Sequence, residues 1–211
     1  KGKTLFRILV EDKNSLMPFS RKFGLPFYQV KDLCHYAKKK GIEVDGVSFH
    51  VGSACKDKQQ YKKAIDTAHM CIATMRSAGF QPSLVDIGGG FIKGEGSSPF
   101  FRESASVIRA SLVKDPYLRY IAEPGRFFST DAFDLFVQVI GKKAGLNGNG
   151  WRYTIDESLY GQFSSICFDQ QSPLWVRIPA KENERTRLFG SGILFGRTCD
   201  SLDLIAKSPS M

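Results

Sequence analysis

The sequence lacks a long apolar segment and lacks the cysteine spacing of a disulfide framework or a zinc site. No run of about 18 uncharged apolar residues occurs, and no basic-then-apolar leader opens the chain. The five cysteines are widely spaced and form no Cys-x-x-Cys pair, which predicts free thiols and no bound metal. These absences predict a cytoplasmic protein that does not contact a membrane.

The sequence also lacks repeats, low-complexity tracts and the motifs of nucleic-acid readers. Its net charge is +9, but lysine and arginine are spread along the chain without an aromatic-interleaved basic stripe. We therefore expect solvated basic faces and no nucleic-acid partner. With 211 residues, 42% of them apolar, the chain can bury the core of one large domain or two small ones.

The first part of the chain alternates short apolar strands with segments of helical periodicity. The pattern predicts strands over 4–10, 47–51, 84–87 and 120–122, and helices from Val30 to Gly41, over 58–78 and over 103–113. Such alternation requires right-handed crossovers and a parallel sheet, either open or closed into a barrel. Four strands amount to half of an eight-stranded barrel.

From Ala132 onward the pattern changes to one typical of β structure. Strands are expected over 133–140, 152–155, 163–168 and 174–178 with no helix between them, and a turn over 145–150. The predicted fold class is therefore α/β, with a partial (β/α)8 barrel over 1–130 followed by part of an all-β domain over 131–211.

Polar residues follow three consecutive predicted strands. His50 and Ser53 follow the second strand, Gly88–Gly90 the third, and Glu123 and Arg126 the fourth. Backbone amides of a glycine loop, a hydroxyl and a guanidinium suit a phosphate group, and barrels bind phosphates at the carboxyl ends of strands. Taken singly, these features also fit a mobile turn, a structural histidine and a salt-bridged turn. Their joint position favours a binding site.

Four motifs in order resemble one family. They are His50-Val51-Gly52-Ser53, Asp86-Ile87-Gly88-Gly89-Gly90-Phe91, Ala122-Glu123-Pro124-Gly125-Arg126 and Thr198-Cys199-Asp200. The chain resembles the ornithine decarboxylase family over nearly its whole length. These enzymes use pyridoxal phosphate and combine an alanine-racemase-like barrel with a C-terminal β domain.

The resemblance implies where the cofactor pyridoxal 5'-phosphate would bind. His50 would stack on the pyridine ring, and Glu123 would pair with the ring nitrogen and keep it protonated. Arg7 would lie near the cofactor behind these residues. The phosphate would be held by Ser53, Gly88, Gly89, Gly90, Gly125 and Arg126.

The resemblance also implies roles in the second half of the chain. Asp169 and Asp200 would bind the distal ammonium of a diamino acid, and Cys199 would donate a proton to the α-carbon after CO2 leaves. Tyr160 resembles a tyrosine at the subunit interface. The implied assembly is a homodimer with shared active sites that converts L-ornithine to putrescine. Without the resemblance, Cys199 reads as an incidental thiol and Asp169 as a turn residue.

The sequence departs from the family in ways that leave alternatives open. The motif that carries the lysine bound covalently to this cofactor is absent, and neither Lys1 nor Lys3 is at its position. We therefore interpret the chain as an internal portion of a longer protein of about 400 residues. Phe168-Asp169-Gln170 differs from the usual Phe/Tyr-Asp-His. Lysine or arginine as substrate and an antizyme-inhibitor-like regulator without catalysis are the alternatives, whereas Cys199-Asp200 disfavours diaminopimelate.

Overall fold

The computed structural model describes residues 4–92, 97–112, 115–145, 150–176, 178 and 192–208. The chain divides into two compact units, residues 1–133 and 134–211. The domain limits expected from the sequence, 1–130 and 131–211, stay a prediction. Lys1 and Lys3 lie outside the described residues.

The first unit is built on a parallel sheet of four strands in the order β1-β3-β5-β6. In register, Phe6 pairs with Val47, Val47 with Val85, and Val85 with Tyr120. A separate antiparallel pair joins β2 to β4. The elements are β1 Leu5–Arg7, β2 Ser15–Met17, the 3-10 helix η1 Phe27–Gln29, α1 Val30–Lys39, β3 Gly46–Ser48, β4 Ser53–Cys55, α2 Lys58–Ser77, β5 Leu84–Asp86, α3 Ser97–Leu112, β6 Arg119–Ile121 and α4 Gly125–Ser129.

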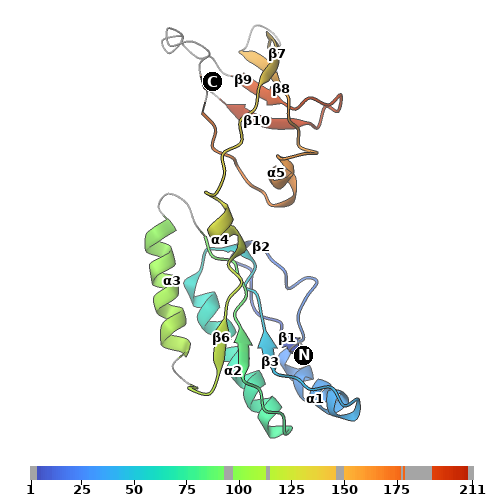
Figure 1. The fold of residues 1–211 in the computed structure, drawn as a ribbon, viewed down its shortest axis with the longest axis vertical. Helices are drawn as coiled ribbons and strands as arrows, with labels where there is room; N and C mark the ends of the chain where they lie inside the picture. The colour runs from blue at the N-terminus through green and yellow to red at the C-terminus, as the bar shows by residue number, and fades with distance from the viewer. Residues whose placement is uncertain are drawn as a thin grey trace. The chain divides into compact units, whose positions relative to one another are not determined.

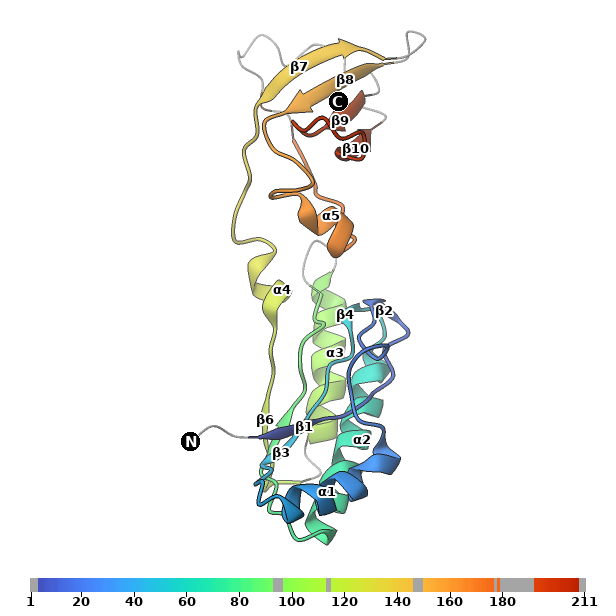
Figure 2. The same cartoon turned by 90° about the vertical axis from the view of Figure 1, so that its right-hand side faces the viewer.

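The three long helices of this unit lie along one face of the parallel sheet (Figures 1 and 2). Each consecutive pair of sheet strands is connected through one of them, as parallel pairing requires. The expected alternation of strand and helix around a parallel sheet is confirmed. Strands β1, β3 and β5 are shorter than expected, and β6 lies one residue earlier than expected. Helix α3 begins before residue 103, and β2, β4 and α4 are additions that the periodicity did not indicate.

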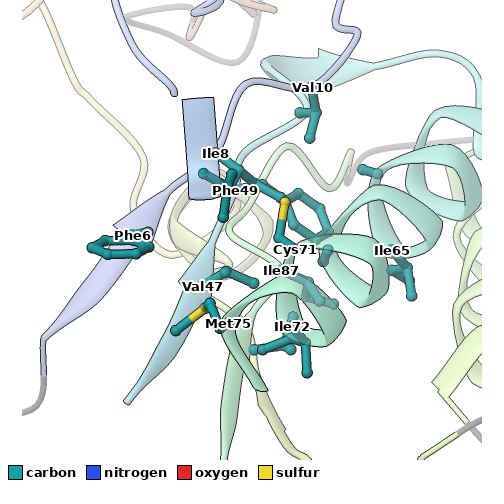
Figure 3. Packing of buried hydrophobic residues seen from close by; sticks show 14 of the residues in the cluster. Phe6, Ile8, Val10, Val47, Phe49, Ile65, Cys71, Ile72, Met75 and Ile87 are labelled. Carbon is teal, nitrogen blue, oxygen red and sulfur yellow. The ribbon is translucent and has the colours of Figure 1, made fainter. Parts of the chain in front are cut away.

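The core of the first unit fills the space between the sheet and α2. Val47 lies in β3 and Phe49 directly follows this strand. Both belong to the same buried cluster as Ile72 and Met75 of α2 (Figure 3). All four side chains have at most 1% of their surface exposed. Apolar residues at spacings of three and four along α2 are buried, which fixes this helix against the sheet. Asp57 caps the first turn of the helix, because its carboxylate accepts a hydrogen bond from the backbone N–H of Gln59.

The second unit contains a four-stranded sheet in the order β10-β9-β8-β7. The pairs β7–β8 and β9–β10 are antiparallel, and β8–β9 is parallel. Its own core gathers around Ile155, Leu159, Leu194 and Ile205. The elements are β7 Val139–Ala144, β8 Trp151–Ile155, α5 Ser164–Phe168, β9 Gly192–Phe195 and β10 Leu204–Ser208.

Several expectations for the second unit are wrong. The strand expected over 163–168 is wrong, because Ser164–Phe168 forms the short helix α5. Residues 174–176 and 178 form no strand, and the strand expected over 133–140 is displaced to β7. Short apolar runs suit a strand and a buried helix equally well, which explains the error at 163–168. The turn expected over 145–150 falls mostly on residues 146–149, which lie outside the described residues.

Among the residues that the structure describes, no helix is both long and apolar enough to span a bilayer.

The two methionines on opposite sides of α2 provide a test of this packing. Met75 is fully buried, whereas Met70 on the same helix is 50% exposed. We expect Met75→Ala to lower the free energy of unfolding by about 2–4 kcal/mol, because it leaves a cavity beneath the sheet. Met70→Ala should change it by less than about 0.5 kcal/mol. Urea denaturation of both variants measures this difference, and equal effects would contradict the described core.

Candidate functional site

Residues from three strand ends line one cavity of about 380 Å³ in the first unit. Strands β3, β5 and β6 are parallel, so their carboxyl ends lie at the same edge of the sheet, and α4 begins just beyond β6 (Figure 1). The cavity is lined by His50, Ser53, Gly90, Phe91, Glu123, Gly125, Arg126 and Ser129. The structure thus brings together most of the first-unit residues singled out in the sequence.

The glycine loop after β5 lies against the backbone that follows β3. Gly88 and Gly90 have φ angles of +64° and +96°, in the region that side chains rarely adopt. A Cβ atom at Gly88 would collide with the carbonyl oxygen of Phe49, and one at Gly90 with that of Gly52. The glycines are therefore required by close backbone approach, which brings the loop to the edge of the cavity.

Hydrogen bonds from β5, α2 and the end of β6 hold the glycine loop in place. The buried carboxylate of Asp86 accepts from the N–H of Gly88 at 2.8 Å. The hydroxyl of Tyr61 on α2 donates to the carbonyl of Gly89 at 3.3 Å. The N–H of Glu123 donates to the carbonyl of Gly88 at 2.8 Å, which ties the loop to the end of β6. Asp86 and Tyr61 were not predicted as site residues.

His50 is an uncharged imidazole at the wall of the cavity. Its Nδ1 accepts a hydrogen bond of 3.0 Å from the N–H of Gly52, which leaves the proton of the neutral ring on Nε2. Burial, and then the positive charge of Arg7, lower the pKa of His50 from its ordinary 6.5 to about 4, against an opposing effect of Asp12. At neutral pH the ring is therefore a flat, neutral surface, and Arg7 lies close enough to influence it.

A turn beside β2 packs on His50. The rings of Phe19 and His50 lie 4.7 Å apart, centroid to centroid, at a tilt of 50°. The buried carboxylate of Asp12 accepts from the N–H groups of Phe19 and Ser20 at 2.5 and 2.7 Å and from the Ser20 hydroxyl at 2.7 Å. Asp12 thus fixes the turn that carries Phe19. No sequence pattern indicates this contact, because it joins residues 31 positions apart.

Ser53 occupies a strained stretch of backbone. The next residue, Ala54, has a φ of 52°, a left-handed conformation that is unfavourable for residues other than glycine. The stretch is held by the pairing of Ser53 with Met17 and by the bond from Cys55 N–H to the carbonyl of Gly90 at 3.0 Å. Strain of this kind persists where surrounding contacts over-determine the backbone, often at functional sites.

The remaining predicted site residues lie in the second unit. The hydroxyl of Tyr160 donates to the carboxylate of Asp200 at 2.5 Å. This bond raises the pKa of Tyr160 and lowers that of Asp200. Cys199 is exposed beside Asp200, and Asp169 lies at the end of α5. Gln170, after Asp169, is the second non-glycine residue with positive φ among those described.

Asp203 organises the loop that carries Cys199 and Asp200. It is 1% exposed, and its carboxylate accepts from Leu159 N–H at 2.8 Å, Thr198 N–H at 3.1 Å and the Thr198 hydroxyl at 2.6 Å. Burial raises its pKa, but these hydrogen bonds outweigh burial and hold the pKa below its usual value. Asp203 lies outside the motifs that predicted the site, so it was not among the predicted residues.

All five cysteines are free thiols, as expected. Within the described ranges, no group of three or more histidine, cysteine, aspartate or glutamate residues is arranged to hold a metal ion.

Comparisons with known proteins point to one family. The family model described as pyridoxal-dependent decarboxylase, pyridoxal binding domain, matches residues 1–130. The chain is 35% identical to ornithine decarboxylase of Caenorhabditis elegans, covering 95% of this chain and 50% of that relative. It is 35% identical to antizyme inhibitor 2 of Xenopus laevis, covering 98% and 48%. The chain therefore spans about half the length of these relatives.

A solved structure agrees with these sequence matches. Arginine decarboxylase of Paramecium bursaria Chlorella virus, bound to agmatine, is 31% identical with a TM-score of 0.86, covering 99% of this chain and 56% of that one. The expected fold class, part of a barrel that binds pyridoxal phosphate followed by part of a β domain, agrees with this structural similarity.

The lowered pKa of His50 predicts a pH dependence of stability. Between pH 6.5 and about 4 the unfolded chain binds a proton that folded His50 does not, so the free energy of unfolding falls as the pH falls through this window. We expect His50→Gln to lose less stability than the parent between pH 7 and 4.5 in urea titrations. His35→Gln, at an exposed position on α1, is the control. An identical pH dependence in parent and His50→Gln would contradict the burial of His50.

Asp203→Asn tests the loop around Cys199. Asparagine offers one acceptor oxygen where the carboxylate offers two. Either the N–H of Leu159 or the two donors of Thr198, its N–H and its hydroxyl, therefore lose their acceptor. We expect a loss of about 1–3 kcal/mol in the free energy of unfolding. Asp156→Asn, at an exposed residue with one backbone hydrogen bond, should lose less than about 1 kcal/mol. Equal losses in the two variants would show that Asp203 does not organise the loop.

Proposed function

This chain belongs to the family of pyridoxal-dependent decarboxylases, and on that premise we propose that the protein containing it converts L-ornithine to putrescine and CO2 with pyridoxal 5'-phosphate. The observation that carries the proposal is the shared cavity at the ends of β3, β5 and β6. The relative from Caenorhabditis elegans supports ornithine as the substrate.

The chemistry of the cavity wall fits the phosphate group of this cofactor. The same cavity is lined by Gly90, Ser53 and Arg126, which offer a backbone amide, a hydroxyl and a guanidinium. Amides and a guanidinium are donors suited to an anion with several acceptor oxygens. We assign the phosphate to these residues together with Gly88, Gly89 and Gly125, and we place Arg7 behind His50.

The wall also fits the aromatic ring of the cofactor. A neutral imidazole such as that of His50 can lie against a ring that carries a positive charge without repelling it. We assign Glu123, on the same cavity, to the ring nitrogen, where its carboxylate would keep that nitrogen protonated. When bound, the cofactor would accept the electron pair that remains when CO2 leaves, and Glu123 would support this by keeping the ring nitrogen protonated.

The second unit would supply the groups that select the substrate and the group that donates the last proton of the reaction. We propose that Asp169 and Asp200 bind the distal ammonium of the diamino acid, with Tyr160 holding the Asp200 carboxylate through their hydrogen bond. Cys199, exposed beside Asp200, would donate the proton to the α-carbon. The homodimer with shared active sites and the cytoplasmic location stay predictions.

Two alternatives are supported by particular observations. Arginine or lysine as substrate is favoured by the similarity to the viral arginine decarboxylase and by Gln170, where the family usually has histidine. A non-catalytic regulator is favoured by the similarity to antizyme inhibitor 2. The residues facing the cavity argue against the regulator, because a protein that binds no cofactor does not require them.

CO2 release from L-ornithine, L-lysine and L-arginine by the whole purified protein tests the proposal. We expect the highest kcat/KM for ornithine, and a loss of about 100-fold or more in kcat for Glu123→Gln, because a neutral amide does not keep the ring nitrogen protonated. Asp156→Gln, at an exposed residue of the second unit, is the matched control. A preference for another amino acid would overturn ornithine as the substrate. No release from any of the three would favour the regulator.

A further inference from the structure

Four aromatic rings form a continuous series between the glycine loop and the helix that carries Arg126. They come from α2, the loop after β5, α3 and α4. The members are Tyr61, Phe91, Phe101 and Phe127. Phe91 lines the cavity, whereas Tyr61, Phe101 and Phe127 are not among the lining residues. We call this series the aromatic stack.

One end of the aromatic stack is anchored in the core. The rings of Tyr61 and Phe91 lie 5.2 Å apart and nearly parallel, at 8°. Tyr61 is 1% exposed, and its hydroxyl donates to the carbonyl of Gly89. The same buried ring therefore holds the glycine loop through its hydroxyl and Phe91 through its face.

The other end supports a helix with little burial of its own. Helix α4 has five residues, none of them buried. The ring of Phe127, next to Arg126 in this helix, stacks on Phe101 at 4.5 Å and 28°. The neighbouring Phe128 is exposed. The Phe101–Phe127 pair is thus a direct contact between α3 and α4.

Phe101 is the link between the two ends. Its ring meets Phe91 edge to face at 6.2 Å and 75°, and meets Phe127 by stacking. Both arrangements are favourable for aromatic pairs. We infer that Phe101 is a positioning residue, which sets the distance between the glycine loop and Arg126, the two groups that would hold the phosphate. This inference depends on the proposed function for its ligand.

The test compares two probes that differ only in the phosphate. Dissociation constants of pyridoxal 5'-phosphate and of pyridoxal are measured by equilibrium dialysis on the whole protein after removal of cofactor. We expect Phe101→Ala to weaken binding of pyridoxal phosphate by about tenfold and of pyridoxal by less than about twofold. Phe101→Tyr, which keeps the ring, should bind both probes as the parent does. Phe23→Ala, at an exposed ring outside the aromatic stack, is a further control.

A double-mutant cycle tests whether Phe101 affects phosphate binding through Arg126. If Phe101 acts through Arg126, the loss caused by Phe101→Ala shrinks to less than about threefold when Arg126 is already alanine. Equal weakening of both probes, or an undiminished loss in the Arg126→Ala protein, would overturn the inference. If Phe101→Ala fails to fold, Phe101→Leu replaces it, with a smaller loss expected for pyridoxal phosphate alone.

The outcomes separate this inference from the proposed function. A parent protein that binds neither probe would contradict the function itself. A parent that binds pyridoxal phosphate, with Phe101→Ala and Phe101→Leu binding it equally well, would contradict the positioning role and leave the function intact.

Discussion

The close approach of the glycine loop to the backbone after β3 is the contact on which the site depends. Gly88 and Gly90 let the loop reach the carbonyls of Phe49 and Gly52, where no side chain fits. The bond from Glu123 N–H to the Gly88 carbonyl then extends the same contact to the end of β6. Three strand ends are thereby joined through backbone contacts, which involve no side-chain rotamers that would have to be ordered.

The electrostatics of the site follow from this burial. His50 is held neutral by burial and by the charge of Arg7, so among the residues that line the cavity the cation that could face an anion is Arg126 rather than the imidazole. The neutral ring of His50 can contact a flat ligand, and a separate guanidinium can attract the charge of that ligand. The overall charge of +9 has no comparable meaning, since it reflects residues spread over the whole chain.

The sequence predicted the first unit well because its signals are local. Helical spacing along α2 and the apolar strands around it depend on neighbours within a few positions, and strand ends in a parallel sheet necessarily meet at one edge. The second unit was predicted poorly because its apolar runs are short and fit either element, as α5 shows. Strands β9 and β10 were missed for a similar reason.

The supporting residues of the site could not have been found from spacing. Asp12, Asp86 and Asp203 are ordinary aspartates in sequence, and their importance arises because folding buries each beside backbone N–H groups. For Asp12 and Asp86 the donors are close in the chain, but burial of the carboxylate is decided by distant elements. Asp203 takes one donor from Leu159, 44 positions away.

The two units differ in how they hold the groups assigned to them, and this bears on how the proposed activity could change. In the first unit the cofactor groups rest on glycine contacts and hydrogen bonds of the backbone, so most substitutions there would disturb the cavity itself. In the second unit, Tyr160 holds Asp200 through side-chain atoms on an exposed surface, and Asp169 precedes the strained Gln170. Side-chain contacts of this kind can be altered singly without refolding the loop, because Asp203 maintains the loop independently. The side-chain groups of the second unit can therefore change one at a time, whereas those of the first unit change together with the cavity.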